Sequence, residues 1–134
     1  MMSATTAGKK AVHTVMSGPA AGSIAAAHLG SAAGFPNTIS CDMGGTSFDI
    51  AIVKGGVPTT TTEKDISYGM PLRVPMVDIQ TIGAGGGSIA RVDAGGILRV
   101  GPESAGATPG PICYGRGGTE PTVTDANLLL GRID

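Results

Sequence analysis

The sequence predicts an α/β fold in which a helix of small residues packs closely against a sheet built from β-hairpins. Residues 20–33 are rich in alanine and are followed by a glycine, which is typical of a helix that approaches its neighbours closely. Residues 38–41 and 48–53 are short apolar stretches on either side of a glycine pair, which favours two strands. With 134 residues, the chain is long enough to form a single domain of ordinary size.

The composition indicates a folded chain with many turns. Glycine supplies 23 of the 134 residues, well above the usual ~7%, but the glycines follow no three-residue period and so do not indicate a collagen-like helix. The hydrophobic share of 41% and the charged share of 14% exclude the pattern typical of disordered chains. The glycines are therefore expected in turns.

Charge and hydropathy exclude several classes of partner. The net charge is −1 and Lys9–Lys10 is the only basic pair, which argues against a nucleic-acid surface. No apolar run approaches the ~18 residues that a membrane helix needs, and the N-terminus has no apolar signal region. Cys41 and Cys113 lie far apart and are expected to be reduced, so we expect a cytoplasmic protein.

The N-terminal part is expected to contain one helix. We interpret residues 1–12 as a flexible or vector-derived lead and residues 13–134 as the folded core. Ser17 is suited to cap the helix and Pro19 to stand in its first turn. Gly34 is expected to end it.

The middle of the chain is predicted to be a β-meander. Gly55–Gly56 is typical of a hairpin turn between the strand at 48–53 and a threonine-rich strand at 58–62. Residues 68–81 are expected to be extended, with breaks at two prolines.

A second hairpin and a short helix are expected in the C-terminal part. Residues 89–93 and 97–100 flank a glycine-rich turn, and residues 101–121 are rich in proline, which predicts a long ordered loop or a mobile lid. Thr122 with Asp125 resembles a capping box for a helix that runs through Leu130.

The segment Asp42–Asp49 is the strongest candidate for a functional site. Its glycines let a ligand approach the backbone, and successive N–H groups in such a turn can bind an anion. Two carboxylates beside phosphate imply Mg²⁺ held through water, and one of them can orient an attacking water. The alternative is a plain hairpin with two solvated acids. The candidate phosphate-binding residues are Gly44, Gly45, Thr46 and Ser47.

A second glycine-rich segment, Gly83–Ser88, is not a Walker A loop, because no lysine follows at the required spacing. It is not a dinucleotide fingerprint either, because the hairpin turn at Gly95–Gly96 leaves no room for the helix that such a motif needs. Two interpretations stay open: the glycines let a nucleotide or another backbone lie flat on this loop, or they serve packing alone. The candidate residues are Gly83, Gly85, Gly86, Gly87 and Ser88.

Other reactive side chains carry weaker signals. Cys113 as a nucleophile needs an activating base, and His13 and His28 lie at the other end of the chain. Histidines and cysteines do not have the spacing of a zinc site. Arg116, among glycines, is a candidate for contact with an anion or a partner.

Several long blocks in a fixed order resemble the hydantoinase A/5-oxoprolinase family. They are SGPAAG (17–22), DMGGTSFD (42–49), TIGAGGGSIA (81–90), VDAGG (92–96), GPESAGATPGP (101–111) and CYGRGGTEPTVTDANLLLGR (113–132). Two positions depart from the family pattern: Phe48 replaces a small hydroxyl residue, and Gln80 replaces a histidine, whereas Asp78 keeps its place.

The resemblance implies a ribonuclease-H-like half of an actin/Hsp70/sugar-kinase-type ATPase, with a mixed sheet, β-hairpins and flanking helices. In that family, ATP hydrolysis is coupled to the opening of cyclic amides such as hydantoins and 5-oxoproline, and relatives include acetone and acetophenone carboxylase subunits. Two halves close over ATP, and each contributes an acid–Gly–Gly–Thr hairpin, of which Asp42–Asp49 corresponds to the second. The implied cofactors are ATP and Mg²⁺, with Asp42 and Asp49 as the catalytic carboxylates.

The resemblance also implies partners. The half with the first hairpin normally precedes the Ser-Gly-Pro-Ala-Ala-Gly block, so we expect this missing N-terminal half, a hydantoinase B-type subunit and a small cyclic-amide substrate. The isolated chain is expected to be inactive. The alternatives are a non-catalytic structural fragment or assembly module, and the nucleotide-binding subunit of an acetone-carboxylase-like enzyme.

Overall fold

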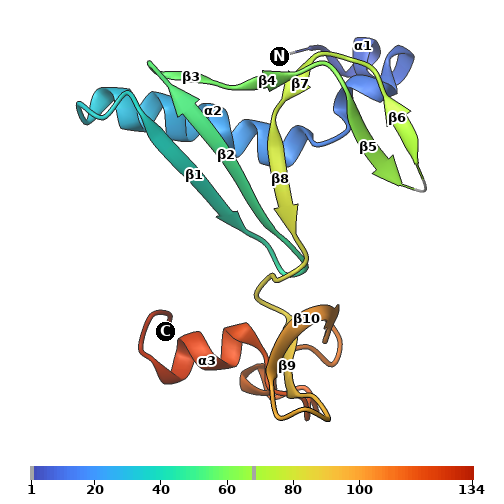
Figure 1. The fold of residues 1–134 in the computed structure, drawn as a ribbon, viewed down its shortest axis with the longest axis vertical. Helices are drawn as coiled ribbons and strands as arrows, with labels where there is room; N and C mark the ends of the chain where they lie inside the picture. Colours follow the sequence, from blue (N-terminus) through green and yellow to red (C-terminus); the bar gives the residue numbers. More distant parts are fainter. Residues whose placement is uncertain (1, 68) are drawn as a thin grey trace. The chain divides into compact units, whose positions relative to one another are not determined.

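The computed structural model describes residues 2–67 and 69–134, and for Ile66 and Ser67 it describes the backbone alone (Figure 1). The chain forms two compact units. Unit 1 comprises the residues up to Asp42 together with Ile50–Gln80, and unit 2 comprises Met43–Asp49 together with Thr81–Asp134. The predicted boundary between residues 12 and 13 stays a prediction, and Met1 in the expected lead lies outside the described residues.

Unit 1 begins with two short helices, α1 (Ala4–Lys9) and η1 (Ala11–Thr14), followed by α2 (Ser17–Ala32). The predicted long helix is confirmed as α2, which ends before a left-handed glycine. The prediction that Ser17 caps α2 is wrong, because Met16 occupies the cap position and Ser17 is already helical. Met16 has a φ of 61°, so the chain turns sharply from η1 into α2 without a side-chain cap.

The larger sheet has β1 (Thr38–Met43), β2 (Phe48–Lys54) and β3 (Val57–Pro58) in that order, and β8 (Ile79–Ile82) also pairs with β2. The predicted strands and the hairpin between β2 and β3 are confirmed, and this pair is antiparallel.

The strand predicted at residues 58–62 is split into β3 and β4 (Thr60–Thr61). The split falls at Thr59, which donates its N–H to the carbonyl of Ile52 at 2.9 Å, whereas β4 pairs with β7 (Met76–Val77).

The expected extended segment at 68–81 is found as β6 (Met70–Leu72), β7 and β8, separated by breaks, and its first residue, Tyr68, lies outside the described residues. β6 pairs with β5 (Lys64–Ser67) in an antiparallel ladder.

Small side chains let α2 lie directly on the sheet, as the alanine-rich sequence predicts. Ala27 of α2 and Ala51 and Val53 of β2 are buried. Ser23 and Ser40 are also buried, and their hydroxyls are 3.3 Å apart. Ser23 also donates to the carbonyl of Pro19 and Ser40 to the carbonyl of Ala51, so these two hydroxyls are paired.

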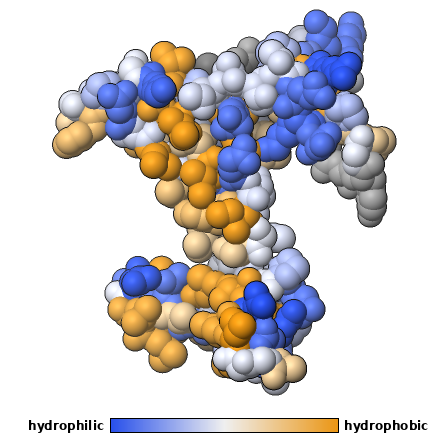
Figure 2. Space-filling view, in the orientation of Figure 1, coloured by the Kyte–Doolittle hydropathy of each residue, from blue (hydrophilic) through white to orange (hydrophobic). Residues whose placement is uncertain are grey.

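Hydrophobic side chains gather over β1 and β2 on the face of unit 1 seen in Figure 2. Ile39 of β1 and Ile52 of β2 are 67% and 51% exposed, whereas Ser40 and Ala51, their neighbours along the strands, are buried. This alternation gives the sheet one face covered by α2 and one that the described residues leave open.

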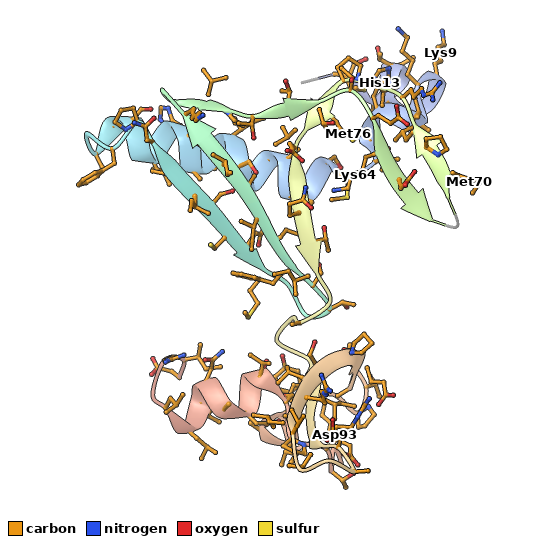
Figure 3. All side chains as sticks on the ribbon, viewed as in Figure 1. Lys9, His13, Lys64, Met70, Met76 and Asp93 are labelled. Atoms are coloured by element: carbon orange, nitrogen blue, oxygen red, sulfur yellow. The ribbon has the colours of Figure 1, made fainter. Side chains whose placement is uncertain are left out.

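Unit 2 contains the hairpin of β9 (Ser88–Val92) and β10 (Leu98–Ser104), then η2 (Ile112–Tyr114) and α3 (Val123–Leu129). The predicted second hairpin is confirmed. At its turn, Asp93 accepts hydrogen bonds from the N–H groups of Gly95 and Ile97 (Figure 3). The pKa of Asp93 is held below its ordinary value, mainly by the hydrogen bond from the Ile97 N–H and next by the hydrogen bond from the Arg99 side chain.

The predicted capping box at the start of α3 is confirmed. Thr122 accepts a hydrogen bond from the N–H of Asp125 at 3.3 Å, and the Asp125 carboxylate accepts one from the N–H of Thr122 at 2.8 Å. The loop expected at 101–121 is shorter than predicted, because β10 continues to Ser104 and η2 forms inside it.

The α/β class with β-hairpins and flanking helices is thereby confirmed. Within the described residues, none of the helices has the length and hydropathy to cross a membrane.

Candidate functional site

The turn Gly44–Ser47 joins β1 to β2 and presents free hydrogen-bond donors. The N–H of Gly44 closes the turn on the carbonyl of Ser47 at 2.9 Å. Gly44, Gly45 and Thr46 are exposed. Among residues 2–67 and 69–134, the N–H groups of Gly45 and Thr46 and the Thr46 hydroxyl donate no hydrogen bond. Such a set of unpaired donors is suited to an anion.

The loop Gly83–Ser88 fixes the direction of those donors. The N–H of Gly86 donates to the carbonyl of Gly44 at 2.9 Å, and the N–H of Gly87 donates to that of Gly45 at 2.7 Å. In a trans peptide the C=O and the following N–H point in opposite directions. Because both carbonyls face the loop, the N–H groups of Gly45 and Thr46 point away from it.

The loop packs so closely on the turn that side chains are excluded. A Cβ at Gly85 would lie 2.6 Å from the nitrogen of Ser47, and one at Gly87 would lie 2.9 Å from the carbonyl oxygen of Gly45. The close approach of another backbone to this loop, which the sequence left open, is observed. Contact between this loop and a nucleotide stays a prediction.

Burial limits how this loop can meet a ligand. Gly85, Gly87 and Ser88 are buried, and within residues 2–67 and 69–134 the Ser88 hydroxyl has no hydrogen-bond partner. Gly83 is exposed, and Gly86 accepts at its carbonyl from both the N–H and the hydroxyl of Thr124, at 2.8 Å each. The loop is therefore held between the turn and α3.

Asp49 is fixed by two hydroxyl groups. Its Oδ1 accepts from the Thr81 hydroxyl at 2.6 Å and its Oδ2 from the Ser47 hydroxyl at 3.1 Å. The Ser47 hydroxyl, predicted to bind phosphate, is thus already donated to Asp49. The carboxylate keeps further lone pairs for hydrogen bonds from water.

Asp42, at the end of β1, belongs to unit 1 and is exposed. Its Oδ2 lies 3.0 Å from the position that a Cβ on Gly22 would take, so this glycine of α2 makes room for the carboxylate. In the part of the chain that the structure describes, three or more His, Cys, Asp or Glu residues nowhere gather as a metal-binding group. The roles of Asp42 and Asp49 in binding Mg²⁺ through its water ligands, which this ion usually keeps, stay predictions.

A pocket of about 410 Å³ lies beside the turn within unit 2. One side is formed by Gly44, Gly45 and the supporting loop. The other side includes Tyr114 of η2 and Asn127 of α3. Sequence reasoning missed both residues, although a polar residue inside the apolar run at 126–130 was a signal for Asn127.

Asp125 anchors the wall that carries Tyr114. Its carboxylate accepts from the N–H groups of Cys113 at 2.8 Å and Ile112 at 3.3 Å, besides Thr122. Burial by itself raises the pKa of Asp125, but the hydrogen bonds from Cys113 and Thr122 outweigh it and hold that pKa well below its usual range.

Cys113 and Arg116 both interact with other residues of unit 2. The hydrogen bond with Asp125, together with burial and the Asp125 charge, raises the pKa of the Cys113 thiol, which is the opposite of what an activated nucleophile needs. Arg116 lies over the Tyr114 ring, 5.5 Å from its centroid, and donates to the carbonyl of Ala107 at 3.5 Å. In unit 1, Gln80 donates to Asp78 at 3.1 Å.

The fold and the turn define a protein with an exposed glycine-containing β-hairpin turn that is supported by a second glycine-rich loop. Over residues 1–134 the chain matches the family model described as Hydantoinase/oxoprolinase, and it belongs to that family. The resemblance seen in the sequence blocks is confirmed.

Relatives with solved structures share this fold. The chain is 53% identical over 126 residues to caprolactamase subunit alpha of Pseudomonas jessenii, covering 93% of this chain and 18% of the relative. The crystal structure of ATP-dependent caprolactamase from that organism matches with a TM-score of 0.70 at 50% identity, over 86% of this chain and 16% of that one. Nucleotide-free acetone carboxylase, described as an ATP-dependent enzyme, matches with a TM-score of 0.70 at 34% identity, over 87% and 16%. The chain thus spans less than a fifth of the length of these relatives.

Proposed function

We propose that this chain is part of an ATP-dependent hydrolase of cyclic amides and that the turn Gly44–Ser47 binds the phosphates of the nucleotide. The observation that carries the proposal is the pair of unpaired N–H groups at Gly45 and Thr46, which face away from the supporting loop. The ATP dependence of caprolactamase and acetone carboxylase, which the names of their structures state, supports the choice of nucleotide.

Each polar group of the turn has a defined role in this proposal. The N–H groups of Gly45 and Thr46 and the Thr46 hydroxyl donate to phosphate oxygens. Asp49, held by two hydroxyls in unit 2, would hold Mg²⁺ through its water ligands and orient a further water. For Asp42, in unit 1, we propose the same kind of contact with magnesium-bound water. When bound, ATP would supply the phosphoryl group that activates the amide carbon for attack by water.

The proposal includes partners and a location. The remaining contacts to the nucleotide come from the N-terminal half with the first hairpin, and a hydantoinase B-type subunit completes the enzyme. The name caprolactamase subunit alpha, which implies further subunits in that relative, supports this assembly. Cys41 and Cys113 are free and exposed, which supports a reducing, cytoplasmic location.

A second candidate is the nucleotide-binding subunit of a carboxylase that acts on a ketone. The observation in its favour is the TM-score of 0.70 with acetone carboxylase, which equals that with caprolactamase. A non-catalytic assembly module is the third candidate, and it requires no nucleotide binding.

Calorimetric titration of Mg-ATP into the chain tests the proposal, with Asp42→Ala beside the wild type. We expect binding to weaken at least tenfold in the variant, because a charge-assisted contact through magnesium-bound water is lost. Asp65→Ala, which removes an exposed carboxylate on β5, is the matched control and is expected to bind like the wild type. Equal affinity in Asp42→Ala and wild type, or no binding in either folded protein, contradicts the proposal for this chain.

A further inference from the structure

We infer that the pocket beside the turn Gly44–Ser47 binds the ring amide of a cyclic-amide substrate and that Asn127 is the residue that recognises it. The inference rests on the proposed function and adds to it a place and a recognition residue for the substrate. Every wall of this pocket belongs to unit 2.

Asn127 offers an unused carboxamide to the pocket. It is half-buried and lines the pocket, and among the hydrogen bonds of the described residues its side chain has none. Thr124, one turn earlier on α3, also lines the pocket, but its hydroxyl is donated to the carbonyl of Gly86. A carboxamide carries two donors and an acceptor, which a bound ligand can satisfy here.

The chemistry of Asn127 matches that of a lactam. In a small lactam the ring forces the amide to be cis, so its C=O and N–H lie on the same edge of the ring. A primary carboxamide presents an N–H and a C=O in the complementary order, and the two groups pair through two parallel hydrogen bonds. A ketone lacks the N–H and can form one of these bonds.

The remaining walls suit the methylene groups of such a ring. Pro111, Tyr114 and Ile133 contribute apolar surface to the pocket. The volume of about 410 Å³ lies in the range of small-molecule sites, roughly 300–1,000 Å³. The walls are held in place, because Asp125 binds the N–H groups beside Tyr114 and also forms the capping box of the helix that carries Asn127.

The position of the pocket favours the substrate over the base of the nucleotide. Gly44 and Gly45 form the opposite wall, and their turn is the proposed phosphate site. A ring amide in this pocket therefore lies beside the phosphates, where the proposed activation takes place. An adenine ring also presents a donor and an acceptor that asparagine can pair with, so adenosine is a necessary competitor in the test.

The test is a ¹H–¹⁵N NMR titration of the whole chain with four small probes: 2-piperidone, N-methyl-2-piperidone, cyclohexanone and adenosine. We expect 2-piperidone to shift the side-chain amide signals of Asn127. N-methyl-2-piperidone and cyclohexanone are expected to bind roughly tenfold more weakly than 2-piperidone, because each loses one hydrogen bond. In Asn127→Asp, the affinity for 2-piperidone is expected to fall roughly tenfold, because the carboxylate cannot donate to the lactam oxygen.

Ala126→Asp is the matched control, since it adds the same charge at the neighbouring exposed position, which does not line the pocket. It is expected to bind 2-piperidone like the wild type. Equal affinity for 2-piperidone and its N-methyl derivative overturns the inference. So does unchanged binding in Asn127→Asp, the absence of any 2-piperidone binding, or a shift of Asn127 by adenosine alone.

Failure of the inference and failure of the proposed function are separable. If Mg-ATP does not bind while 2-piperidone still shifts Asn127, the proposed function fails and the pocket assignment stands. If Mg-ATP binds and 2-piperidone does not, the inference alone fails.

Discussion

The two glycine-rich segments of unit 2 have similar compositions and opposite environments. In the turn Gly44–Ser47 the glycines are exposed, and the N–H groups of Gly45 and Thr46 are free in the described structure. In the loop Gly83–Ser88, Gly85 and Gly87 are buried, and the N–H groups of Gly86 and Gly87 are donated to the turn. One segment has backbone N–H groups on exposed residues, and the other donates backbone N–H groups to the first segment.

The reason for glycine also differs between the two segments. Neither Gly45 nor Gly85 has a left-handed φ, so backbone conformation requires glycine at neither position. At Gly85 a Cβ would collide with the backbone of the turn, whereas at Gly45 nothing lies within 4 Å of an added Cβ. Packing therefore explains Gly85. The free space at Gly45 is what the approach of a ligand to the backbone requires.

Gly85→Ala is expected to have the largest effect on this comparison. The added methyl group would lie 2.6 Å from backbone atoms that cannot move independently of the turn, so we expect a loss of about 3 kcal/mol in the free energy of unfolding. Urea denaturation followed by circular dichroism measures it.

Gly45→Ala is the matched control for that experiment, because the same methyl group meets nothing there. Its free energy of unfolding is expected to change by less than about 1 kcal/mol. Similar stability of the two variants would show that the loop does not support the turn.

Asp125→Asn tests whether α3 helps to stabilise the buried loop Gly83–Ser88. The carboxylate accepts from Cys113, Ile112 and Thr122, and α3 holds Gly86 through Thr124. We expect a loss of about 2 kcal/mol in the free energy of unfolding at pH 7, since charged hydrogen bonds and a cap are weakened.

The pH dependence of that loss has a definite sign. Because the pKa of Asp125 is lowered by folding, its stabilisation is complete above the unfolded pKa of about 3.9 and is lost as the pH falls through the folded value. The difference in the free energy of unfolding between wild type and Asp125→Asn is therefore expected to be constant from pH 7 to 5 and to decrease below about pH 4. A gap that widens on acidification contradicts this account.

Thr46→Val separates ligand binding from stability in the exposed segment. The side chains have nearly the same shape, and the Thr46 hydroxyl donates no hydrogen bond within the described residues. We expect an unchanged free energy of unfolding and an affinity for Mg-ATP that falls about fivefold. Unchanged affinity in calorimetry would remove the hydroxyl from the proposed phosphate site.

The smallest effect is expected at Cys113. The hydrogen bond with Asp125 raises the pKa of its thiol, so Asp125→Asn is expected to increase the rate of its alkylation by iodoacetamide at pH 8 by roughly threefold. Cys41, on β1, serves as the internal control in the same mass-spectrometric experiment. Equal acceleration of both thiols would indicate general loosening of the fold in place of a local change.

Local signals in the sequence were enough to determine most elements and the position of the turn. The alanine-rich helix, the two hairpins and the Thr122–Asp125 capping box depend on residues within a few positions of one another, and all are found in the structure. The turn within the Asp-Met-Gly-Gly-Thr block was recognisable for the same reason, whereas its role in anion binding stays a prediction.

The tertiary structure decided what each glycine segment does and which side chains face the turn. Gly85 meets Ser47 across 38 positions, and Tyr114 and Asn127 line a pocket with Gly44 although 70 and 83 positions separate them from it. The cap of α2 is also Met16 and not the predicted Ser17, because the chain enters that helix from η1. Contacts over such separations depend on how whole elements pack, and no local spacing in the sequence encodes that packing.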